Sequence, residues 1–471
     1  MPRFAESSRL PFRWQGFARE GRCFRCRPAA FLWLLLSVCY GPIASAQVTT
    51  FRWIEQPSEA LRTRLQLIDA AEHRIDVAYY AIDSGAASAS ILDALVDASR
   101  RGVRVRVLMD GCKSRLPQTF LCWLSQQGLD VRVFHRPTLL EPRKMNRRFH
   151  GKWLIVDEQT LLVGSRNLED AHFALDSEKC FVDSEAVIHG AVARCATRTM
   201  DRLWKSDHLS FGREGTGWRI TQCDALDAGD DEEKAILRDG GCYGRQLDLA
   251  RVKVERQIDN NLCERVTNGT VGSMQHVASG KFHWLVDDCL DKSRRSFQCD
   301  IIRIMDAAKS CLQIESPYPA MSPEIRDAIL RAARRGVAVT MVTNSGRSTD
   351  QRNVYAAYQN DKRELLAAGV GLHEYIGDGT LHAKLMVVDH SLAMLGTYNF
   401  DARSDTLNLE NAVVSDDANW VSSAETSFRS RLRCSQSVEP KPWLPIPDAT
   451  PHRWLSIQWR RAVVPFYRWA L

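Results

Sequence analysis

The chain has 471 residues, of which 45% are hydrophobic and 25% are charged, and its formal net charge is +6. These totals are typical of a folded globular protein that is long enough for two or three domains. The mildly basic charge suits anionic partners such as phosphate groups or acidic lipid surfaces, but it is too small for this length to indicate a nucleic-acid binder.

The first 46 residues have the features of a secretory signal peptide. Seven arginines and two glutamates in residues 1–28 precede an apolar run, Ala29–Tyr40, and Ala44 and Ala46 frame a small-residue cleavage site before Gln47. The run is shorter than the roughly 20 residues that span a bilayer. We therefore expect export, to the periplasm or the periplasmic face of the membrane, with an uncleaved membrane anchor as the alternative.

The segment from residue 47 onward alternates helix-like and strand-like stretches. Helices are predicted over Glu59–His73 and Ser88–Arg101, next to the β-rich runs RIDVAYY and VRVRVLM. Gly102 stands where the second helix must stop before it turns into a strand. This alternation predicts an α/β domain with helices on the faces of a sheet.

A histidine, a lysine and an aspartate follow at a fixed spacing in FHGKWLIVDE. If this stretch is a strand, His150 and Lys152 point to the same side, because side chains alternate between faces. Asp157 then opens a turn into a second apolar strand, after which Ser165 and Asn167 come back beside the first pair.

Between about residues 210 and 296 the alternation dissolves into acidic and turn-rich sequence. The middle of the chain carries Cys223, Cys242, Cys263, Cys289, Cys299 and Cys311. We expect disulfides here in an oxidising compartment, and Cys112 and Cys122 could close a further short loop. No spacing of cysteines and histidines resembles a zinc site. The segment is interpreted as a linker or insertion, with a lid over a substrate site as the alternative.

The last third repeats the first. LQIESPY is predicted as a strand and Ser322–Arg335 as a helix, and LHAKLMVVDH places His382, Lys384 and Asp389 at the same offsets as before. Thr397 and Asn399 follow at the same distance as the earlier serine and asparagine.

Other stretches recur in the same order, so the similarity is not confined to one motif. RRGVRVRVLMD (100–110) corresponds to RRGVAVTMVTN (334–344), and GLDVRVFH (128–135) corresponds to GVGLHEYI (369–376). The chain is therefore interpreted as a duplicated domain, residues 47–209 and 297–440.

Imidazole, ammonium and hydroxyl or amide groups on one surface suit attack at phosphorus. Lysine and asparagine can neutralise the oxygens of the phosphoryl group, while one histidine attacks and a second protonates the leaving alkoxide. Each repeat supplies one histidine, so two repeats facing each other across a pseudo-two-fold axis would assemble one site. A duplicated domain that has lost activity is the alternative.

These motifs resemble those of the phospholipase D superfamily, His-x-Lys-x4-Asp followed by Gly-Ser-x-Asn. GTYNFDARSDTLNLENAVV (396–414) and ESPY (315–318) are similar to bacterial cardiolipin synthases, and GSRNLEDAHFA (164–174) and FVDSEAVI (181–188) to the type that uses phosphatidylethanolamine as phosphatidyl donor. The resemblance implies two pseudo-symmetric phospholipase D-like α/β sandwich domains in one chain, a monomer with an internal pseudo-dimer, and neither metal nor cofactor.

The resemblance also implies residue roles. His150 would be the nucleophile and His382 the general acid and base, an assignment that is easily reversed. Asp157 and Asp389 would complete the motifs in structural or orienting roles, and Glu410, with its counterpart Glu185, would orient the histidines. The phosphate-binding groups would be Lys152, Lys384, Asn167, Asn399, Ser165 and Thr397. The first half lacks the FDxRS continuation of the second, which leaves its acceptor pocket undefined.

The C-terminal tail, residues 441–471, interleaves aromatic residues and arginines in PHRWLSIQWRRAVVPFYRWAL. Such a mixture suits the headgroup region of an anionic membrane surface. The alternative is a helix packed on the domain, and Pro465 limits the length of such a helix.

The function predicted from these features is transfer of a phosphatidyl group from a phospholipid to an alcohol, through phosphohistidine, to make cardiolipin. Hydrolysis of the same phospholipid to phosphatidic acid is the main alternative. A nuclease and a non-catalytic lipid-binding protein are further alternatives, and the modest charge and the lipid-like tail argue against nucleic acid as a partner.

Overall fold

The computed structural model describes most of the chain after the expected signal peptide. The described residues are 49–114, 116–135, 146–176, 180–210, 247, 250–251, 254–255, 275–276, 281–288, 295–439 and 451–463. The expected signal peptide and most of the expected linker therefore lie outside the described residues, and both stay predictions.

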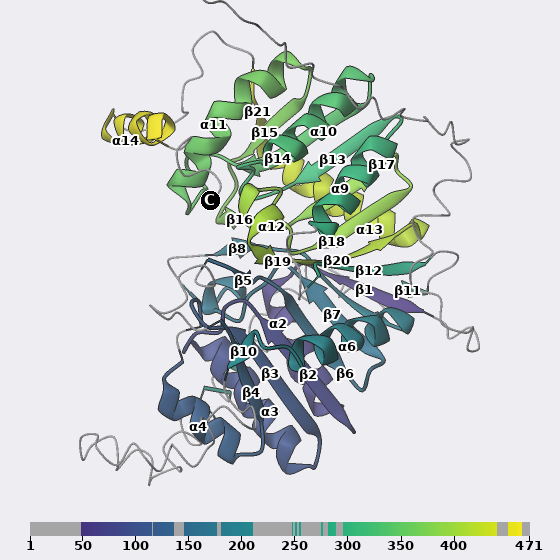
Figure 1. Cartoon of the computed structure of the whole chain (residues 1–471), viewed down its shortest axis with the longest axis vertical. Coiled ribbons are helices and arrows are strands. Elements are labelled where there is room, and N and C mark those ends of the chain that lie inside the picture. The colour runs from purple at the N-terminus through teal and green to yellow at the C-terminus, as the bar shows by residue number, and fades with distance from the viewer. Residues whose placement is uncertain are drawn as a thin grey trace, which may run out of the picture. The chain divides into compact units, whose positions relative to one another are not determined.

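The first half is built on a nine-stranded sheet, drawn in purple to teal in Figure 1, with strand order β10-β4-β3-β2-β6-β7-β9-β1-β11. Strands β2, β3 and β4 are parallel, and β6, β7, β9 and β1 continue the sheet in antiparallel fashion. The bounds are β1 Thr50–Ile54, β2 Arg74–Tyr79, β3 Arg104–Asp110, β4 Asp130–Phe134, β6 Lys152–Val156, β7 Thr160–Gly164, β9 Glu185–His189, β10 Leu209–Ser210 and β11 Gln275–His276. The helices are α2 Pro57–Asp69, α3 Ala86–Arg100, α4 Gln118–Gln126, the short 3-10 helix η2 Asp170–His172, and α6 Ala191–Trp204.

The second half, drawn in green to yellow in Figure 1, has an eight-stranded sheet of order β12-β20-β18-β17-β13-β14-β15-β21. The strands are β12 Phe282–Val286, β13 Cys311–Glu315, β14 Ala338–Asn344, β15 Gly371–Tyr375, β17 Leu385–Val388, β18 Leu392–Gly396, β20 Asn411–Ser415 and β21 Ser435–Ser437. The helices are α9 Ser296–Ala307, α10 Pro323–Arg334, α11 Arg352–Ala367, α12 Ala402–Thr406, α13 Ala418–Arg433 and α14 Pro451–Val463. Read from β4 to β1 and from β15 to β12, the two sheets share one strand order, so the α/β fold class and the two repeated halves are confirmed.

The predicted helices form with small shifts of their ends. The first begins at Pro57, whose fixed φ suits the first helical turn, and ends at Asp69. The predicted continuation to His73 does not form, because the backbone N–H groups of Glu72, His73 and Arg74 donate to the carboxylate of Asp157 instead.

The start of α10 follows the prediction. Ser322 caps the helix by accepting a hydrogen bond from the backbone N–H of Ile325, and proline occupies the first turn. Gly336 ends this region with φ +88°, a backbone conformation that residues with a Cβ rarely adopt. Strand β13, which precedes α10, ends at Glu315, so the strand predicted for LQIESPY stops before SPY.

Each half has its own hydrophobic core, and a third core is shared. The shared core joins residues of the first sheet and α6 to residues of the second sheet and α13. Trp153 packs edge-on against Trp284 with ring centroids 5.5 Å apart, and Phe51 packs against Trp420 at 5.3 Å. Burying these large rings between the halves ties the two repeats together through apolar surface.

Two short strand pairs also cross between the halves. Strand β5, Arg148–Phe149, pairs in parallel with β19, Asn408–Leu409. Strand β16, Thr380–Leu381, pairs in parallel with β8, Phe181–Val182. Each pair ends directly before one of the motif histidines, so backbone hydrogen bonding between the halves positions both of them.

Some cysteine predictions are wrong. Cys112 has a free thiol, so the expected Cys112–Cys122 loop is not closed. Cys299, which is exposed on α9, and Cys311, at the start of β13, also have free thiols. The remaining four cysteines of the expected disulfide cluster lie outside the described residues.

The described part of the tail, α14, packs on α11 through polar contacts and one buried apolar side chain. Asn360 of α11 accepts a hydrogen bond from the Arg461 guanidinium at 3.1 Å and donates one to the Arg461 carbonyl at 3.0 Å. Ile457 is buried against the second core, whereas Trp459 is 67% exposed. The alternative of a packed helix therefore describes residues 451–463. Within the described part of the chain, no helix has the length and apolar character needed to cross a bilayer.

Candidate active site

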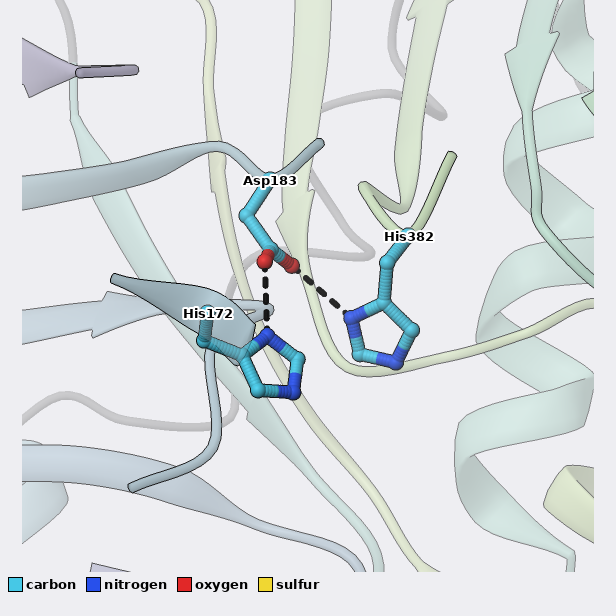
Figure 2. Close-up of side chains that lie close together, drawn as sticks. All are labelled: His172, Asp183 and His382. Atoms are coloured by element: carbon cyan, nitrogen blue, oxygen red, sulfur yellow. Dashed lines mark hydrogen bonds and ion pairs between the residues drawn. The ribbon is translucent and has the colours of Figure 1, made fainter. Parts of the chain in front are cut away.

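Each motif histidine is hydrogen-bonded to a carboxylate that belongs to the opposite half. Nδ1 of His150 lies 2.8 Å from Oε2 of Glu410, and Nδ1 of His382 lies 2.8 Å from Oδ1 of Asp183. Figure 2 shows the second pair. The cross-half strand pairs set this arrangement: the backbone N–H of His150 donates to Leu409, and that of His382 donates to Val182. Both Nδ1 positions are therefore occupied, which leaves Nε2 of each ring for chemistry.

The two motif lysines are buried beside the histidines. Nζ of Lys152 donates to the His150 carbonyl at 2.8 Å, and Nζ of Lys384 donates to the His382 carbonyl. Strands β6 and β17 begin at or just after these lysines, so the histidines precede the strands instead of lying within them as predicted. Each ammonium therefore lies against the backbone of its own motif histidine.

A tyrosine covers each histidine and lysine pair, and the sequence did not point to either tyrosine. The ring of Tyr80 lies 4.7 Å from the His150 ring and 5.1 Å from Nζ of Lys152. The ring of Tyr318 lies 6.1 Å from the His382 ring and 6.0 Å from Nζ of Lys384. The aromatic faces shield the cations from water while stabilising their charge.

Electrostatics show that the two repeats converge. Burial lowers the pKa of Lys152 to about 8. Burial and the charge of Lys152 lower the pKa of Lys384 to about 7. Burial also lowers the pKa of His150 to about 4, although Glu410 opposes the change, and holds the pKa of His382 well below its ordinary value. The positive charges of these lysines and histidines disfavour one another. A bound anion such as a phosphodiester would offset this repulsion.

The motif hydroxyls lie against the carboxylates. The Ser165 hydroxyl donates to Asp183 at 2.6 Å, and the Thr397 hydroxyl donates to Glu410. Burial raises the carboxyl pKa values, but His150 and the other donors more than offset this and lower the pKa of Glu410 to about 2. In this structure the two hydroxyls donate to the carboxylates, and their predicted contact with a phosphate stays a prediction.

The two motif asparagines are buried, and the amide oxygen of each has no hydrogen-bond partner. The Asn167 amide N–H donates to Glu169 at 3.1 Å. An amide oxygen and nitrogen are distinguished only by their hydrogen bonds, so either end of an asparagine can be turned toward a ligand. A buried amide with unused hydrogen-bonding capacity is suited to an oxygen of a bound phosphate.

Comparison with known proteins identifies the family. The family model described as "Cardiolipin synthase, PLD-like domain" matches residues 65–204 and 301–432, which are more than half of the chain. The chain belongs to this family. It is accordingly an enzyme of the phospholipase D superfamily, a phospholipid phosphodiesterase or phosphatidyltransferase.

Individual relatives agree with the family. Cardiolipin synthase C of Escherichia coli K12 is 26% identical over 389 residues, covering 76% of this chain and 79% of that protein. Cardiolipin synthase A of Erwinia tasmaniensis is 27% identical over 409 residues, covering 85% and 73%. The crystal structure of phosphatidylserine synthase from Haemophilus influenzae Rd KW20 has a TM-score of 0.65 at 13% identity, covering 94% and 100%, a likeness of fold.

The aspartates of the two repeated motifs, Asp157 and Asp389, have no described hydrogen bond to His150 or His382. Asp157 accepts the backbone N–H groups before β2, and Asp389 accepts those of Lys309, Ser310 and Cys311 before β13. Burial raises the pKa of each carboxyl, but these backbone donors outweigh it and keep both pKa values below the ordinary range. The two residues fix the turn at the far end of β6 and β17, which is a structural role.

Glu185 is not the counterpart of Glu410. Its carboxylate forms buried ion pairs with Arg64 and Arg166, and none of its described hydrogen bonds reaches a histidine. Asp183 takes that place because it follows β8, as Glu410 follows β19. Asp183 could have been identified as the residue that directly follows the short strand pairing with the other half.

His172 is a further site residue that the sequence did not single out. Its Nδ1 lies 2.7 Å from the second oxygen of Asp183, so this carboxylate bridges His172 and His382 (Figure 2). Among the described residues, this trio could hold a metal ion, since its ligand atoms lie within 4.8 Å of one another. The 2.7 and 2.8 Å contacts are the lengths of N–H···O hydrogen bonds, and two buried ammonium groups lie nearby, so the geometry fits a hydrogen-bonded trio.

Proposed function

We propose that the protein is a phosphatidyltransferase of the cardiolipin synthase type that works through a phosphohistidine intermediate. The observation that carries the proposal is the pair of buried imidazoles, each with Nδ1 on a carboxylate of the other half and each beside a buried lysine. A transfer that passes through a covalent intermediate needs one attacking imidazole and one proton carrier, and the duplicated fold supplies both.

In the first step Nε2 of His150 attacks the phosphorus of a phospholipid. The N–P bond forms, the P–O bond to the headgroup breaks, and His382 gives the leaving alkoxide a proton from Nε2. Lys152 and Lys384, with Asn167 and Asn399, hold the non-bridging oxygens as negative charge develops.

In the second step an acceptor hydroxyl gives its proton to His382 and attacks the same phosphorus, which breaks the N–P bond and frees His150. Glu410 and Asp183 stabilise the imidazolium forms and keep each ring in the tautomer with the proton on Nδ1. The negative charge of the bound phosphodiester raises the low histidine pKa values, so that the acid can be protonated when a donor lipid is present.

The donor proposed is phosphatidylethanolamine and the acceptor is the glycerol hydroxyl of phosphatidylglycerol, so the product is cardiolipin. The support is the similarity of the first-half motif to synthases with this donor, together with relatives named cardiolipin synthase. With water as acceptor the same intermediate would give phosphatidic acid. We further propose that the protein acts as a monomer at the periplasmic face of an anionic membrane, with exposed Trp459 near that surface.

The test uses the purified full chain with vesicles of phosphatidylethanolamine and phosphatidylglycerol, and mass spectrometry of the lipids. We expect cardiolipin and free ethanolamine with wild-type protein and with His73→Ala, whose side chain is 81% exposed, and neither product with His382→Ala. Phosphatidic acid without cardiolipin would establish the hydrolase instead. Degradation of DNA with no change in the lipids would overturn both lipid readings.

A further inference from the structure

The two carboxylates behind the histidines share two kinds of partner and differ in the third. Each accepts from a histidine of the other half and from the hydroxyl that follows a β-strand. The next donor to Glu410 is the Ser404 hydroxyl at 2.8 Å, and the next donor to Asp183 is the His172 ring at 2.7 Å. His172 and Ser404 each come five residues after the motif asparagine of their half. A histidine in the first half therefore stands where the second half has a serine.

The surroundings of His172 are built to hold an imidazole. Its side chain is 1% exposed, and its ring stacks on Phe181 with centroids 4.4 Å apart and planes 15° apart. Nδ1 faces Asp183, and Nε2 faces Glu169 at 3.6 Å and the amide of Asn167 at 3.3 Å. Apart from His382, the ionisable groups facing it are thus two carboxylates, one on each side of the ring.

This environment favours the imidazolium form. Burial lowers the pKa of His172, but the charges of Asp183 and Glu169 more than offset burial, and the pKa is raised above its ordinary value. Nδ1 lies within hydrogen-bonding distance of Asp183 and Nε2 lies 3.6 Å from Glu169, so a negative charge faces each nitrogen and both charges favour the imidazolium form.

A positive charge on His172 disfavours protonation of His382, because both rings contact the carboxylate of Asp183. Both oxygens of Asp183 are occupied, one by each imidazole, and the two rings lie 5.0 Å apart in an edge-on arrangement (Figure 2). A cation on His172 neutralises the carboxylate that would otherwise stabilise a cation on His382. The described partners of Glu410 other than His150 are hydroxyl or amide groups without charge, so His150 has no such competitor.

We propose that His172 is a positioning residue that holds Asp183 and, through it, lowers the proton affinity of His382 relative to that of a dyad with a neutral third partner. The proposal rests on the proposed function, in which His382 is the general acid and base. A lower proton affinity makes His382 a stronger acid toward the departing headgroup alkoxide, so His172 gives two otherwise equivalent histidines different roles.

The informative variant is His172→Asn. Asparagine keeps an N–H donor near the position of Nδ1 but cannot ionise, so it separates the hydrogen bond from the charge. His172→Ser copies the second half and is a second charge-free variant. Two controls match them: His73→Asn removes an exposed histidine, and Ser404→Ala removes the equivalent neutral donor on the other dyad.

The first readout needs no substrate. Protein with 13C-labelled histidines is titrated by NMR, with the His382 signal assigned from its loss in His382→Ala. We expect the pKa of His382 to rise by about one unit in His172→Asn and His172→Ser, as removal of a neighbouring cation requires, and to stay unchanged in both controls. An unchanged His382 pKa in well-folded His172→Asn and His172→Ser would overturn the proposal.

The second readout is the pH profile of kcat/KM for phosphatidyl transfer. Activity falls at high pH as the acid loses its proton, so the alkaline limb should move up by about one unit in His172→Asn while KM stays within about two-fold. A purely structural role would lower the rate without moving the limb, and that result would also contradict the proposal. If wild-type protein transfers no phosphatidyl group, the proposed function fails, and the NMR titration still decides the coupling.

Discussion

The Glu410 dyad and the Asp183 dyad occupy equivalent places in two halves that share one strand order, yet they differ in charge. Glu410 collects neutral donors from Thr397, Ser404 and Asn408, whereas Asp183 is shared with a second imidazole. A symmetric scaffold brings the two histidines together, but transfer at phosphorus needs one attacking group and one proton carrier. The departure from symmetry is therefore where unlike roles can arise.

Replacing either motif histidine should have the largest effect on activity. His150→Ala and His382→Ala should each lower phosphatidyl transfer by at least about 10³-fold, because one loses the attacking atom and the other the proton carrier. The measurement is the steady-state rate with phosphatidylethanolamine and phosphatidylglycerol vesicles. A variant that keeps a tenth of the wild-type rate would show that its histidine is not essential.

The next effect tests the carboxylates. Asp183→Asn and Glu410→Gln keep the shapes but remove the charges that hold each Nδ1 proton, and kcat should fall by about 10²-fold in each. Glu185→Gln is the contrasting variant: it breaks the pairs with Arg64 and Arg166, so the free energy of unfolding should fall by about 3 kcal/mol with kcat of the folded protein little changed. The reverse pattern, a kcat effect larger for Glu185 than for Asp183, would contradict the geometry.

A smaller effect concerns the motif aspartates. Asp389→Asn removes a charge that accepts backbone N–H groups, so the free energy of unfolding should fall by about 1–2 kcal/mol while kcat changes less than about two-fold. Its folded pKa lies below the ordinary value, so this stabilisation is present at neutral pH and is lost as the pH falls through the folded pKa. Urea unfolding at pH 7 and at pH 3 measures both parts, and an equal effect at the two pH values would count against the assignment.

The smallest effect is expected at Thr397, where the first half has a serine instead of a threonine. Thr397→Ser gives the second half the serine that the first half has at Ser165, and the donor to Glu410 is kept. Transfer should stay within about two-fold of wild type, whereas Thr397→Ala should lower kcat further. A strong loss in Thr397→Ser would mean that the threonine methyl group, and not the hydroxyl, is required.

The sequence predicted the repeated α/β halves because strand and helix patterns are local and occur twice in the same order. It also predicted the lysines and histidines that meet in the site. The lysines could be paired with their own histidines because both lie within three residues of one another.

The carboxylates could not be placed with the same success. Asp183 comes 18 positions after Ser165, but Glu410 comes 13 positions after Thr397, so the spacing in one half does not locate the carboxylate of the other. What fixes Asp183 is the pairing of β8 with β16 in the other half, and no local spacing reveals a contact between strands so far apart. His172 was missed for the same reason, since its role depends on Asp183.

In the proposed mechanism, imidazoles from separate repeats act in turn on one phosphorus atom. The direct measurement traps the intermediate by rapid denaturation during turnover of a phosphodiester with a p-nitrophenolate leaving group, which needs little protonation, and locates the bound group by mass spectrometry. We expect a phosphodiester on His150 in wild type and in His382→Ala, with slow release in the variant and none formed in His150→Ala. Turnover of wild type with no modified histidine in either motif would contradict this mechanism.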